Sequence, residues 1–265
     1  MEHSKPESSP RMPPFSASAV GAPHRPRMTE AAVERIRRWH ERAYAAMRSV
    51  GMHRVSYLGL NLVVPTQVFA PAQASMIMGR AVLTEVRPED RVLDVGTGSG
   101  VNAILAASRA SSVLGIDSNP YAIGCARDNA VRNGFGQRCE FRQSDLFEQV
   151  SEAFDLIIFD PPFRWFKPRD LLETAISDDN YGTLRRFFDQ VCVRLRPGGR
   201  VLLFFGDTGD LRFLHELVAN HGLTETTIAT WQLREEGRRA DYFVFRLTCS
   251  AQRNRAPRGR QEPPR

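Results

Sequence analysis

Cysteine is scarce in this chain. Four occur among 265 residues, and no two form a Cys-x-x-Cys pair or have a histidine at metal-ligand spacing: Cys125, Cys139, Cys192 and Cys249. Zinc sites and disulfide frameworks depend on such clusters. We therefore expect no bound metal, and we expect all four to be buried or incidental thiols of a reducing compartment.

Long apolar runs are missing as well. The longest, Val201–Phe205, has the length of a strand, far short of the roughly 20 residues that a membrane helix needs. The first five residues are polar, and no apolar segment of the kind found in signal peptides follows them. These absences predict a soluble cytoplasmic protein without a membrane partner.

The excess of basic charge is confined to the ends of the chain. The net charge is +6, but nine of the 36 Lys and Arg residues and three of the 30 Asp and Glu residues lie in 1–28 and 250–265. Residues 29–249 therefore carry equal numbers of both signs. Proteins that grip nucleic acid through their fold usually carry a basic stripe there, so a nucleic-acid partner is possible but unsupported. Both tails are predicted to be disordered.

Between the tails, hydrophobic periodicity predicts a single domain of alternating strands and helices. An N-terminal extension over 29–85 holds a helix from Glu30 to about Val50 with Thr29 as its N-cap, a strand or hairpin at 55–64, and a helix at 72–85. Over 86–249, strands at 91–95, 112–116, 139–143, 156–159 and 200–205 are separated by helices that start after 100 and cover 120–133, 181–195 and 208–221. Two last strands, 226–233 and 242–247, flank a turn that contains Arg238 and Arg239. This order predicts a Rossmann-like, doubly wound, mostly parallel seven-stranded sheet with a C-terminal antiparallel hairpin.

A glycine-rich turn follows the first of these strands. Its spacing is Gly-x-Gly-x-Gly, whereas a nicotinamide dinucleotide site prefers Gly-x-Gly-x-x-Gly. The segment resembles motif I of class I S-adenosylmethionine-dependent methyltransferases. The resemblance implies that Asp94 lies near the methionine end of this cofactor and that the turn lines its ribose and methionine portion: Gly96, Thr97, Gly98 and Gly100.

The next two strands also end in acidic residues. Asp117 and Ser118 follow one strand, and Asp145 and Leu146 follow the other. A carboxylate at such a strand end can accept both ribose hydroxyls, which is the role we expect for Asp117. In the methyltransferases that the chain resembles, an aspartate at the third strand end takes the adenine amino group and the next backbone N–H meets the ring, which implies these roles for Asp145 and Leu146. Three strand ends at one edge of a sheet predict an S-adenosylmethionine site.

The fourth strand ends in Asp160-Pro161-Pro162-Phe163. This resembles the Asn/Asp/Ser-Pro-Pro-aromatic tetrad of amino-methyltransferases. The Asp160 side chain and the Pro161 carbonyl would accept the two N–H groups of a poorly nucleophilic nitrogen and aim it at the methyl carbon. Prolines stiffen the loop, and Phe163 can stack on a planar substrate. We predict these four as catalytic residues, with Asp160 also beside the cofactor.

Within the class, the chain resembles the HemK-like, or methyltransferase small, branch that modifies release-factor glutamine. The resemblance implies that Phe69 and Ser75 lie close to the cofactor. Asp160 is a departure, because those enzymes carry asparagine, which both donates and accepts, whereas an ionised aspartate only accepts. The expected acceptor is an amino or amide nitrogen of a protein glutamine, a nucleobase or a small molecule, with a small molecule or peptide favoured.

Several readings stay open at this stage. Four residues after the tetrad either cap the substrate pocket or belong to a solvated loop: Trp165, Phe166, Lys167 and Arg169. The first helix either packs on the core or acts as a lid. A related enzyme could transfer or cyclise the aminocarboxypropyl group instead of methyl, and a non-catalytic binding module is a third reading that the intact acidic residues disfavour.

Overall fold

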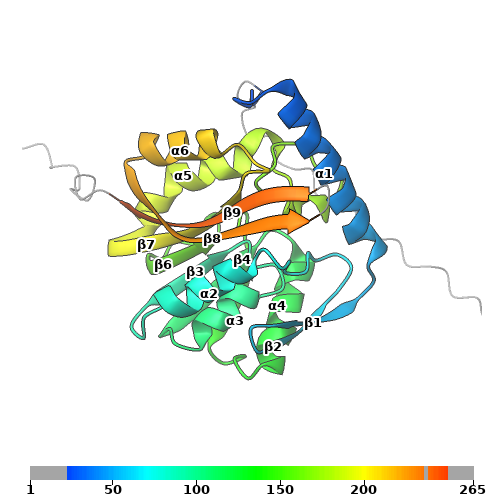
Figure 1. Ribbon diagram of the computed structural model, residues 1–265. Coiled ribbons are helices and arrows are strands. Elements are labelled where there is room, and N and C mark those ends of the chain that lie inside the picture. The colour runs from blue at the N-terminus through cyan, green and yellow to red at the C-terminus, as the bar shows by residue number, and fades with distance from the viewer. Residues whose placement is uncertain (1–22, 236–237, 250–265) are drawn as a thin grey trace, which may run out of the picture.

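The computed structural model describes residues 23–235 and 238–249 (Figure 1). Residues 1–22 of the predicted N-terminal tail and all of the predicted C-terminal tail, 250–265, lie outside this part. The helices are α1 (Glu30–Ser49), α2 (Met76–Glu85), α3 (Val101–Ala107), α4 (Pro120–Arg132), α5 (Gly182–Arg194) and α6 (Leu211–Asn220). Two short 3-10 helices, η1 (Glu173–Ala175) and η2 (Asp179–Tyr181), lie between β6 and α5. The strands are β1 (His53–Tyr57), β2 (Leu60–Val64), β3 (Arg91–Val95), β4 (Ser112–Asp117), β5 (Cys139–Gln143), β6 (Phe154–Phe159), β7 (Leu195–Gly206), β8 (Leu223–Glu235) and β9 (Arg238–Cys249).

A seven-stranded sheet forms the centre of the molecule. Its strand order is β5-β4-β3-β6-β7-β9-β8. The first four junctions are parallel and the last two are antiparallel. Helices α5 and α6 cover one face, and α2, α3 and α4 cover the other (Figure 1). The predicted Rossmann-like sheet with its C-terminal hairpin is confirmed.

Each parallel strand sends side chains into both layers. In β3, Val92 faces the core shared with α2, α3 and α4, whereas Leu93 and Val95 face the core shared with α5 and α6. In β6, Ile158 and Ile157 divide in the same way. This alternation is the two-residue period of a strand buried on both faces, so the carboxyl ends of all the parallel strands are held at one edge.

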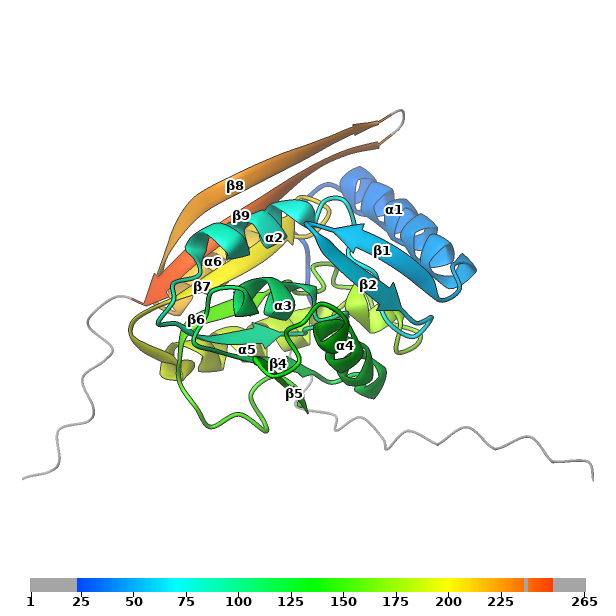
Figure 2. The ribbon, with the colours of Figure 1, turned by 90° about the horizontal axis from the view of Figure 1, so that it is seen from below.

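The N-terminal extension is an antiparallel hairpin, β1 with β2, attached to helix α1 (Figure 2). The Thr29 hydroxyl accepts a hydrogen bond from the Ala32 N–H at 3.3 Å, so the predicted N-cap is confirmed. The hairpin is fastened to α4 by Asn129, whose side chain accepts from Val63 N–H at 2.9 Å and donates to the Ser99 carbonyl at 3.0 Å. One buried amide therefore joins the extension to the glycine-rich turn.

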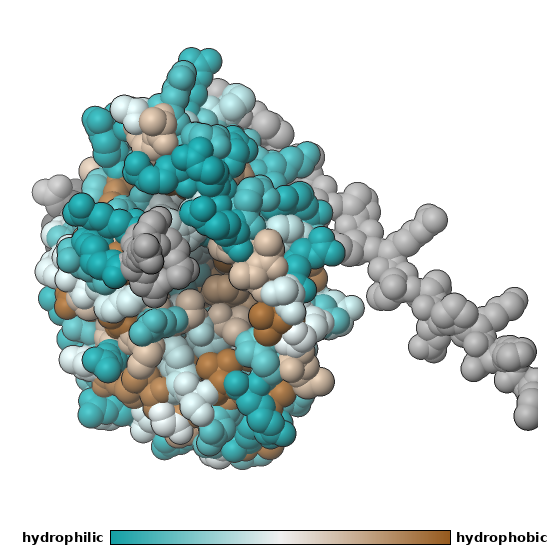
Figure 3. Space-filling view, turned by 45° about the vertical axis from the view of Figure 1, so that its right-hand side comes forward, coloured by the Kyte–Doolittle hydropathy of each residue, from teal (hydrophilic) through white to brown (hydrophobic). Residues whose placement is uncertain are grey.

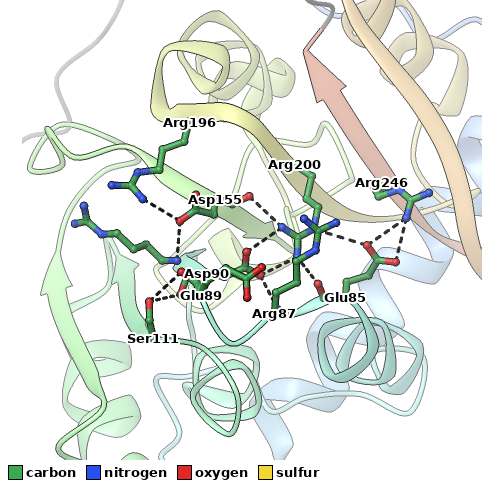
Figure 4. Close-up of polar contacts among 10 residues, drawn as sticks. Glu85, Arg87, Glu89, Asp90, Ser111, Asp155, Arg196, Arg200 and Arg246 are labelled. Atoms are coloured by element: carbon green, nitrogen blue, oxygen red, sulfur yellow. Dashed lines mark hydrogen bonds and ion pairs between the residues drawn. The ribbon is translucent and has the colours of Figure 1, made fainter.

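A polar network closes the opposite edge of the sheet, where the strands begin (Figure 4). Arg200 of β7 is 4% exposed and pairs with the buried Asp90 at 2.8 Å. It also donates to the carbonyl oxygens of Glu85 and Asp155. Arg246 of β9 contacts the Glu85 carboxylate at 3.2 Å. The network ties the end of α2 to three strands.

Strands β7, β8 and β9 are longer than the sequence predicts. The pairing of β8 with β9 continues to Glu235 opposite Arg238, so the residues predicted as a turn at 234–241 are mostly strand. Arg239 is exposed as expected, but it lies in β9. Strand β7 begins at Leu195 because this residue already pairs with Phe154, although Pro197 and the glycines after it suggest a turn.

The cysteines correct a second expectation. Cys192, near the end of α5, and Cys249, the last residue of β9, are joined in a disulfide bond. Only Cys125 and Cys139 are free thiols, so the prediction of four unpaired cysteines is wrong. The two partners are 57 residues apart in sequence, and no local spacing pattern reveals a pair that only the fold brings together.

The last six residues of the predicted N-terminal tail, 23–28, do not behave as a tail. His24 lies against the domain, with its ring nitrogen 3.1 Å from the Asp210 carboxylate, and the Arg27 N–H donates to the same carboxylate at 3.2 Å. Residues 23–28 therefore belong to the folded unit. Among the described helices, none has the length and hydrophobicity to cross a membrane.

Candidate active site

The glycine-rich turn lies between β3 and α3 with an unusual backbone. Gly96, Gly98 and Gly100 all have positive φ, at 68°, 54° and 83°, a conformation that side chains with a Cβ rarely adopt. A Cβ at Gly96 would meet nothing within 4 Å, whereas one at Gly100 would lie 2.9 Å from Ala126 of α4. Gly100 therefore allows α3 and α4 to pack closely, and Gly96 borders open space.

Asp94 stabilises this turn through hydrogen bonds. It is buried, and its carboxylate accepts from the Thr97 hydroxyl at 2.7 Å and from the Ala103 N–H of α3 at 3.1 Å. Burial raises the pKa of Asp94 to about 7, against the lowering effect of these two hydrogen bonds. The carboxylate therefore fixes both the turn and the start of α3.

Asp117 lies at the end of β4, beside the same turn. One carboxylate oxygen accepts from the Gly98 N–H and the other from the Asn119 N–H, both at 2.9 Å. Burial raises the pKa of Asp117. The exposed Ser118 follows it. Each carboxylate oxygen has a second lone pair, so this group can still accept two hydroxyls.

Asp145 follows β5 and is half-exposed. Its two carboxylate oxygens accept hydrogen bonds from the guanidinium group of Arg186 in α5, at 2.7 and 2.9 Å. Leu146 next to it is held at a φ of 47°, and its carbonyl accepts from the Ser144 hydroxyl at 2.7 Å. Arg186 could not be recognised from the sequence, because nothing in a helix 41 residues away marks it as a partner of Asp145.

Asp160 follows β6, next to β3 in the sheet. Burial raises the pKa of its carboxyl to about 7, and the nearby charge of Asp94 adds to the effect. Tyr57 of β1 lies close enough that the Asp160 charge contributes to the raised pKa of this phenol, mainly an effect of burial. The Tyr57 hydroxyl donates to the Ser75 carbonyl at 2.5 Å. The hairpin of the extension thus forms part of the wall around Asp160.

The loop with the predicted residues Phe69 and Ser75 is tied to the same edge. The Asn119 side chain donates to the Gln67 carbonyl at 2.9 Å. Phe69 is half-buried and Ser75 is buried. The end of β4 and this loop are therefore linked by a direct hydrogen bond.

The remainder of the tetrad enters the domain interior. Pro161 is buried and Pro162 is half-buried. The half-buried Phe163 ring packs against Phe205 at 5.4 Å and Tyr242 at 6.3 Å between ring centres. The Phe163 carbonyl accepts from the Tyr181 hydroxyl at 2.8 Å. This packing fixes the loop that carries Asp160.

The four residues after the tetrad, which either cap the substrate pocket or lie in a solvated loop, differ in their exposure. Trp165 is buried against Tyr181, and Phe166 packs on His40 of α1, whereas Lys167 is exposed. Arg169 is exposed, but its guanidinium group forms an ion pair with Glu173 at 2.6 Å.

Helix α1 packs on this same segment. His40 and Glu173 are both buried and lie 2.7 Å apart, and Arg169 also reaches Glu41 at 2.9 Å. Tyr44 hydrogen bonds to Asp170. These contacts fasten α1 to the loop after the tetrad, which agrees with the prediction of a packed helix.

The strand ends border a hollow on the surface. The face on which the carboxyl ends of the parallel strands emerge shows an apolar recess below the hydrophilic side chains of the α1 side (Figure 3). A separate cavity of about 360 Å³ lies away from these residues, lined by His24, Arg27, Arg185, Asp210 and Phe213. The acidic groups lie at the strand ends and not in this cavity, so the strand ends are the candidate site.

Comparison with known proteins identifies the class. The chain matches the family model described as "Methyltransferase small domain" over residues 66–222, more than half of its length. The chain belongs to this family, and it is an S-adenosylmethionine-dependent methyltransferase. The predicted class, cofactor and methyl transfer are confirmed, and the aminocarboxypropyl alternative has no support.

Individual relatives are named for several activities. A Methanocaldococcus jannaschii protein, provisionally named a protein N5-glutamine methyltransferase, is 30% identical over 167 residues, which cover 60% of this chain and 83% of that protein. The release factor glutamine methyltransferase of Cereibacter sphaeroides is 33% identical over 156 residues, 53% of this chain and 55% of that enzyme. The ribosomal RNA small subunit methyltransferase C of Chromohalobacter salexigens is 34% identical over 113 residues, 43% of this chain and 30% of that enzyme. The chain thus spans most of the first and about half or less of the other two.

Solved structures share the fold at low identity. Trm5 of Methanocaldococcus jannaschii, in complex with adenosine, has a TM-score of 0.58 at 16% identity and covers 75% of this chain and 55% of that one. A precorrin-6y C5,15-methyltransferase of Geobacter metallireducens has a TM-score of 0.52 at 16% identity and covers 69% and 94%. At these identities the likeness shows the fold alone.

Proposed function

We propose that this enzyme transfers the methyl group of S-adenosylmethionine to an amide or amino nitrogen held by Asp160 and Pro161. The proposal rests on one observation, which is that the Asp160 carboxyl has no hydrogen-bond donor. Its carboxyl is half-buried beside the glycine-rich turn, and no side chain or backbone N–H of the described residues donates to it. Its acceptor positions are therefore free, and a carboxylate that reaches the surface in this way can accept the N–H groups of a substrate.

The cofactor fits the three preceding strand ends. The open space beside Gly96 and Gly98 allows a ligand to approach the backbone of the turn, with Thr97 and Gly100 completing the turn. We assign Asp117 and Ser118 to the ribose, Asp145 and Leu146 to the adenine, and Asp94 to the methionine end. S-adenosylmethionine supplies an electrophilic methyl carbon on a sulfonium, so the protein's task is to bind, orient and exclude water.

Asp160 and its neighbours align the acceptor nitrogen. The carboxylate and the Pro161 carbonyl accept its two N–H groups, which directs the lone pair away from them. A negative carboxylate also favours the positive charge that develops on an attacking nitrogen. Pro161 and Pro162 contribute no N–H that would compete for these acceptors, and Phe163 fixes the loop through its aromatic contacts.

The acceptor is best described as an amine or amide of a small molecule or peptide. Two of the relatives are named for glutamine methylation and one for ribosomal RNA methylation. The equal numbers of basic and acidic residues in 29–249 favour the first kind over a nucleic acid. A cytoplasmic location stays a prediction.

Two matched variants test this assignment on the full chain. Asp160→Ala is expected to reduce methyl transfer at least about 100-fold while the affinity for S-adenosylhomocysteine, measured by calorimetry, changes little. Asp117→Ala is expected to weaken that affinity about 10- to 100-fold, because charged hydrogen bonds to a ligand are lost. Methyl-labelled cofactor with protein, RNA and small-molecule fractions of a cell extract identifies the acceptor class. Full turnover by Asp160→Ala would remove the tetrad from the mechanism.

A further inference from the structure

Arg164, the residue directly after the tetrad, is a buried cation without a partner. It is 5% exposed, and its Nε is enclosed with no hydrogen-bond acceptor. No ion pair or hydrogen bond among the described residues involves its guanidinium group. Burial lowers the pKa of Arg164 to about 10, so the group still carries its charge at neutral pH.

Among the residues that the structure describes, one other arginine is buried to this degree, and it behaves differently. Arg200 is 4% exposed and is paired with the buried carboxylate of Asp90 at 2.8 Å. An unpaired buried charge destabilises a fold, whereas a paired one is compensated. Both arginines have an Nε without an acceptor, but Arg200 has an anionic partner, whereas Arg164 has none among the described residues.

The surroundings of Arg164 are aromatic and uncharged. Its Cζ lies 5.4 Å from the centre of the Phe163 ring. Electrostatic effects on its pKa come from the hydroxyl groups of Tyr181 and Tyr242. Its charge also contributes to the lowered pKa of His40, which is mainly an effect of burial. Asp207 influences Tyr242 from nearby but forms no ion pair with Arg164. The described residues thus leave one positive charge unbalanced beside the substrate loop.

We infer that Arg164 binds a carboxylate carried by the methyl acceptor, which makes the acceptor an acidic small molecule or peptide. This inference rests on the proposed transfer to a nitrogen at Asp160. A guanidinium fork matches a carboxylate in geometry and charge. Four residues of extended chain span at most about 14 Å, so one acceptor can reach both Asp160 and Arg164.

The number of charges favours a carboxylate over a nucleic acid. A single cation among aromatic rings balances a single negative charge. An RNA segment brings one phosphate per nucleotide and is bound through several cations. The aromatic rings around Arg164 instead provide an apolar enclosure that strengthens one ion pair.

The test uses acceptors that differ only in one charge. The probes are the monoamides of succinic, glutaric, adipic and pimelic acid, each compared with its neutral methyl ester. Their affinities for the full chain loaded with S-adenosylhomocysteine are measured by calorimetry. At least one acid is expected to bind about tenfold or more tightly than its ester. Equal affinities throughout, or no binding of any acid, overturns the inference.

Variants of Arg164 then assign the preference to this side chain. Arg164→Gln is expected to abolish the preference for the acid and leave the affinity for S-adenosylhomocysteine unchanged, and Arg164→Lys is expected to retain part of it. A preference that survives Arg164→Gln contradicts the inference.

Thermal unfolding separates ligand binding from a structural role. Arg164→Gln is expected to raise the melting temperature of the ligand-free protein, because an unpaired buried charge is removed. Arg200→Gln is the matched control and is expected to lower it. A melting temperature that falls in both variants shows that Arg164 is structural.

Methyl transfer to the same amides is measured separately with labelled cofactor. An Arg164-dependent preference for acids without transfer supports the inference and counts against the amide as acceptor. If the methyl ester of an amide is methylated as fast as the corresponding acid, the result supports the proposed function and overturns the inference. Binding of an RNA oligonucleotide that Arg164→Gln weakens, with no binding of the acids, also overturns it.

Discussion

At the scale of single residues, Asp160 links pH to activity. Burial raises the pKa of its carboxyl from 3.8 to about 7. Because the ionised carboxylate favours the charge that develops on nitrogen, kcat/KM for the cofactor is expected to rise about tenfold between pH 6 and pH 8, since this ratio reports ionisation in the free enzyme. The measurement is a pH–rate profile of the wild type and of Asp160→Asn, which cannot ionise.

The variant profile decides which group titrates. Asp160→Asn is expected to give a flat and lower profile, whereas a step near pH 7 that persists would assign the titration to another group, such as Asp94. The free energy of unfolding depends on pH in the opposite direction to the activity. A raised pKa means that the folded chain holds this proton between pH 3.8 and about 7, so the stability falls as pH rises through that window. Asp160→Asn is expected to remove this fall in urea unfolding.

Single residues also mark the limit of what the sequence predicts about the site. The strand-end aspartates are recognisable because strand, acidic residue and turn are adjacent in sequence. Arg186, which holds Asp145, and Tyr57, which borders Asp160, come from other elements. Arg164 stands next to the tetrad, yet its role depends on burial without a counter-ion, and burial is a property of the fold.

At the scale of elements, the buried pair of Arg200 and Asp90 fastens β7 to the segment before β3 (Figure 4). Arg200→Met leaves the Asp90 carboxylate buried without its cation, and the expected loss is about 3–5 kcal/mol in the free energy of unfolding. Urea denaturation at an unchanged m-value measures it. Arg246→Met removes a more exposed pair with Glu85, and it is expected to cost no more than about 1 kcal/mol.

A double variant shows whether the buried pair or general packing is responsible. Asp90→Asn with Arg200→Met removes both charges, so it is expected to recover part of the stability that Arg200→Met loses. A double variant that is less stable by the sum of the two single losses would mean that the residues act independently.

The elements themselves follow from the sequence where local rules decide them. The predicted strand at 91–95 coincides with β3, and the predicted strand at 139–143 coincides with β5. Both runs are bounded by polar or turn residues. The hairpin strands β8 and β9 run further than predicted because charged residues such as Arg234 and Asp241 pair across them. The pairing partners are seven residues apart, and the charged residues between the two apolar runs are also typical of a turn, so the sequence alone predicts a longer turn here.

At the scale of the whole molecule, the disulfide between Cys192 and Cys249 joins the layer of α5 to the last strand of the sheet. Closing a segment of 57 residues restricts the unfolded chain, and the chain-entropy estimate is about 4 kcal/mol. Cys192→Ala with Cys249→Ala is therefore expected to lower the free energy of unfolding by about 2–4 kcal/mol. Urea denaturation without reductant measures it, and the variant should be insensitive to dithiothreitol, whereas the wild type should lose the same stability when reduced.

A thiol count tests the bond in its cellular setting. Protein alkylated during cell lysis and unfolded in guanidinium is expected to carry two modified cysteines, Cys125 and Cys139, rather than four. Stable disulfides are characteristic of oxidising compartments and rare in the cytosol, so this count also tests the predicted cytoplasmic location. Two modified cysteines would mean that this chain keeps a disulfide where most proteins do not, or resides elsewhere. Four would mean that the cytosol keeps Cys192 and Cys249 reduced, and the stability of the enzyme in the cell would then be that of the reduced chain. Because Cys249 ends β9 beside the start of β7, at the edge opposite Asp160, the reduced enzyme is expected to keep its kcat at temperatures where it remains folded.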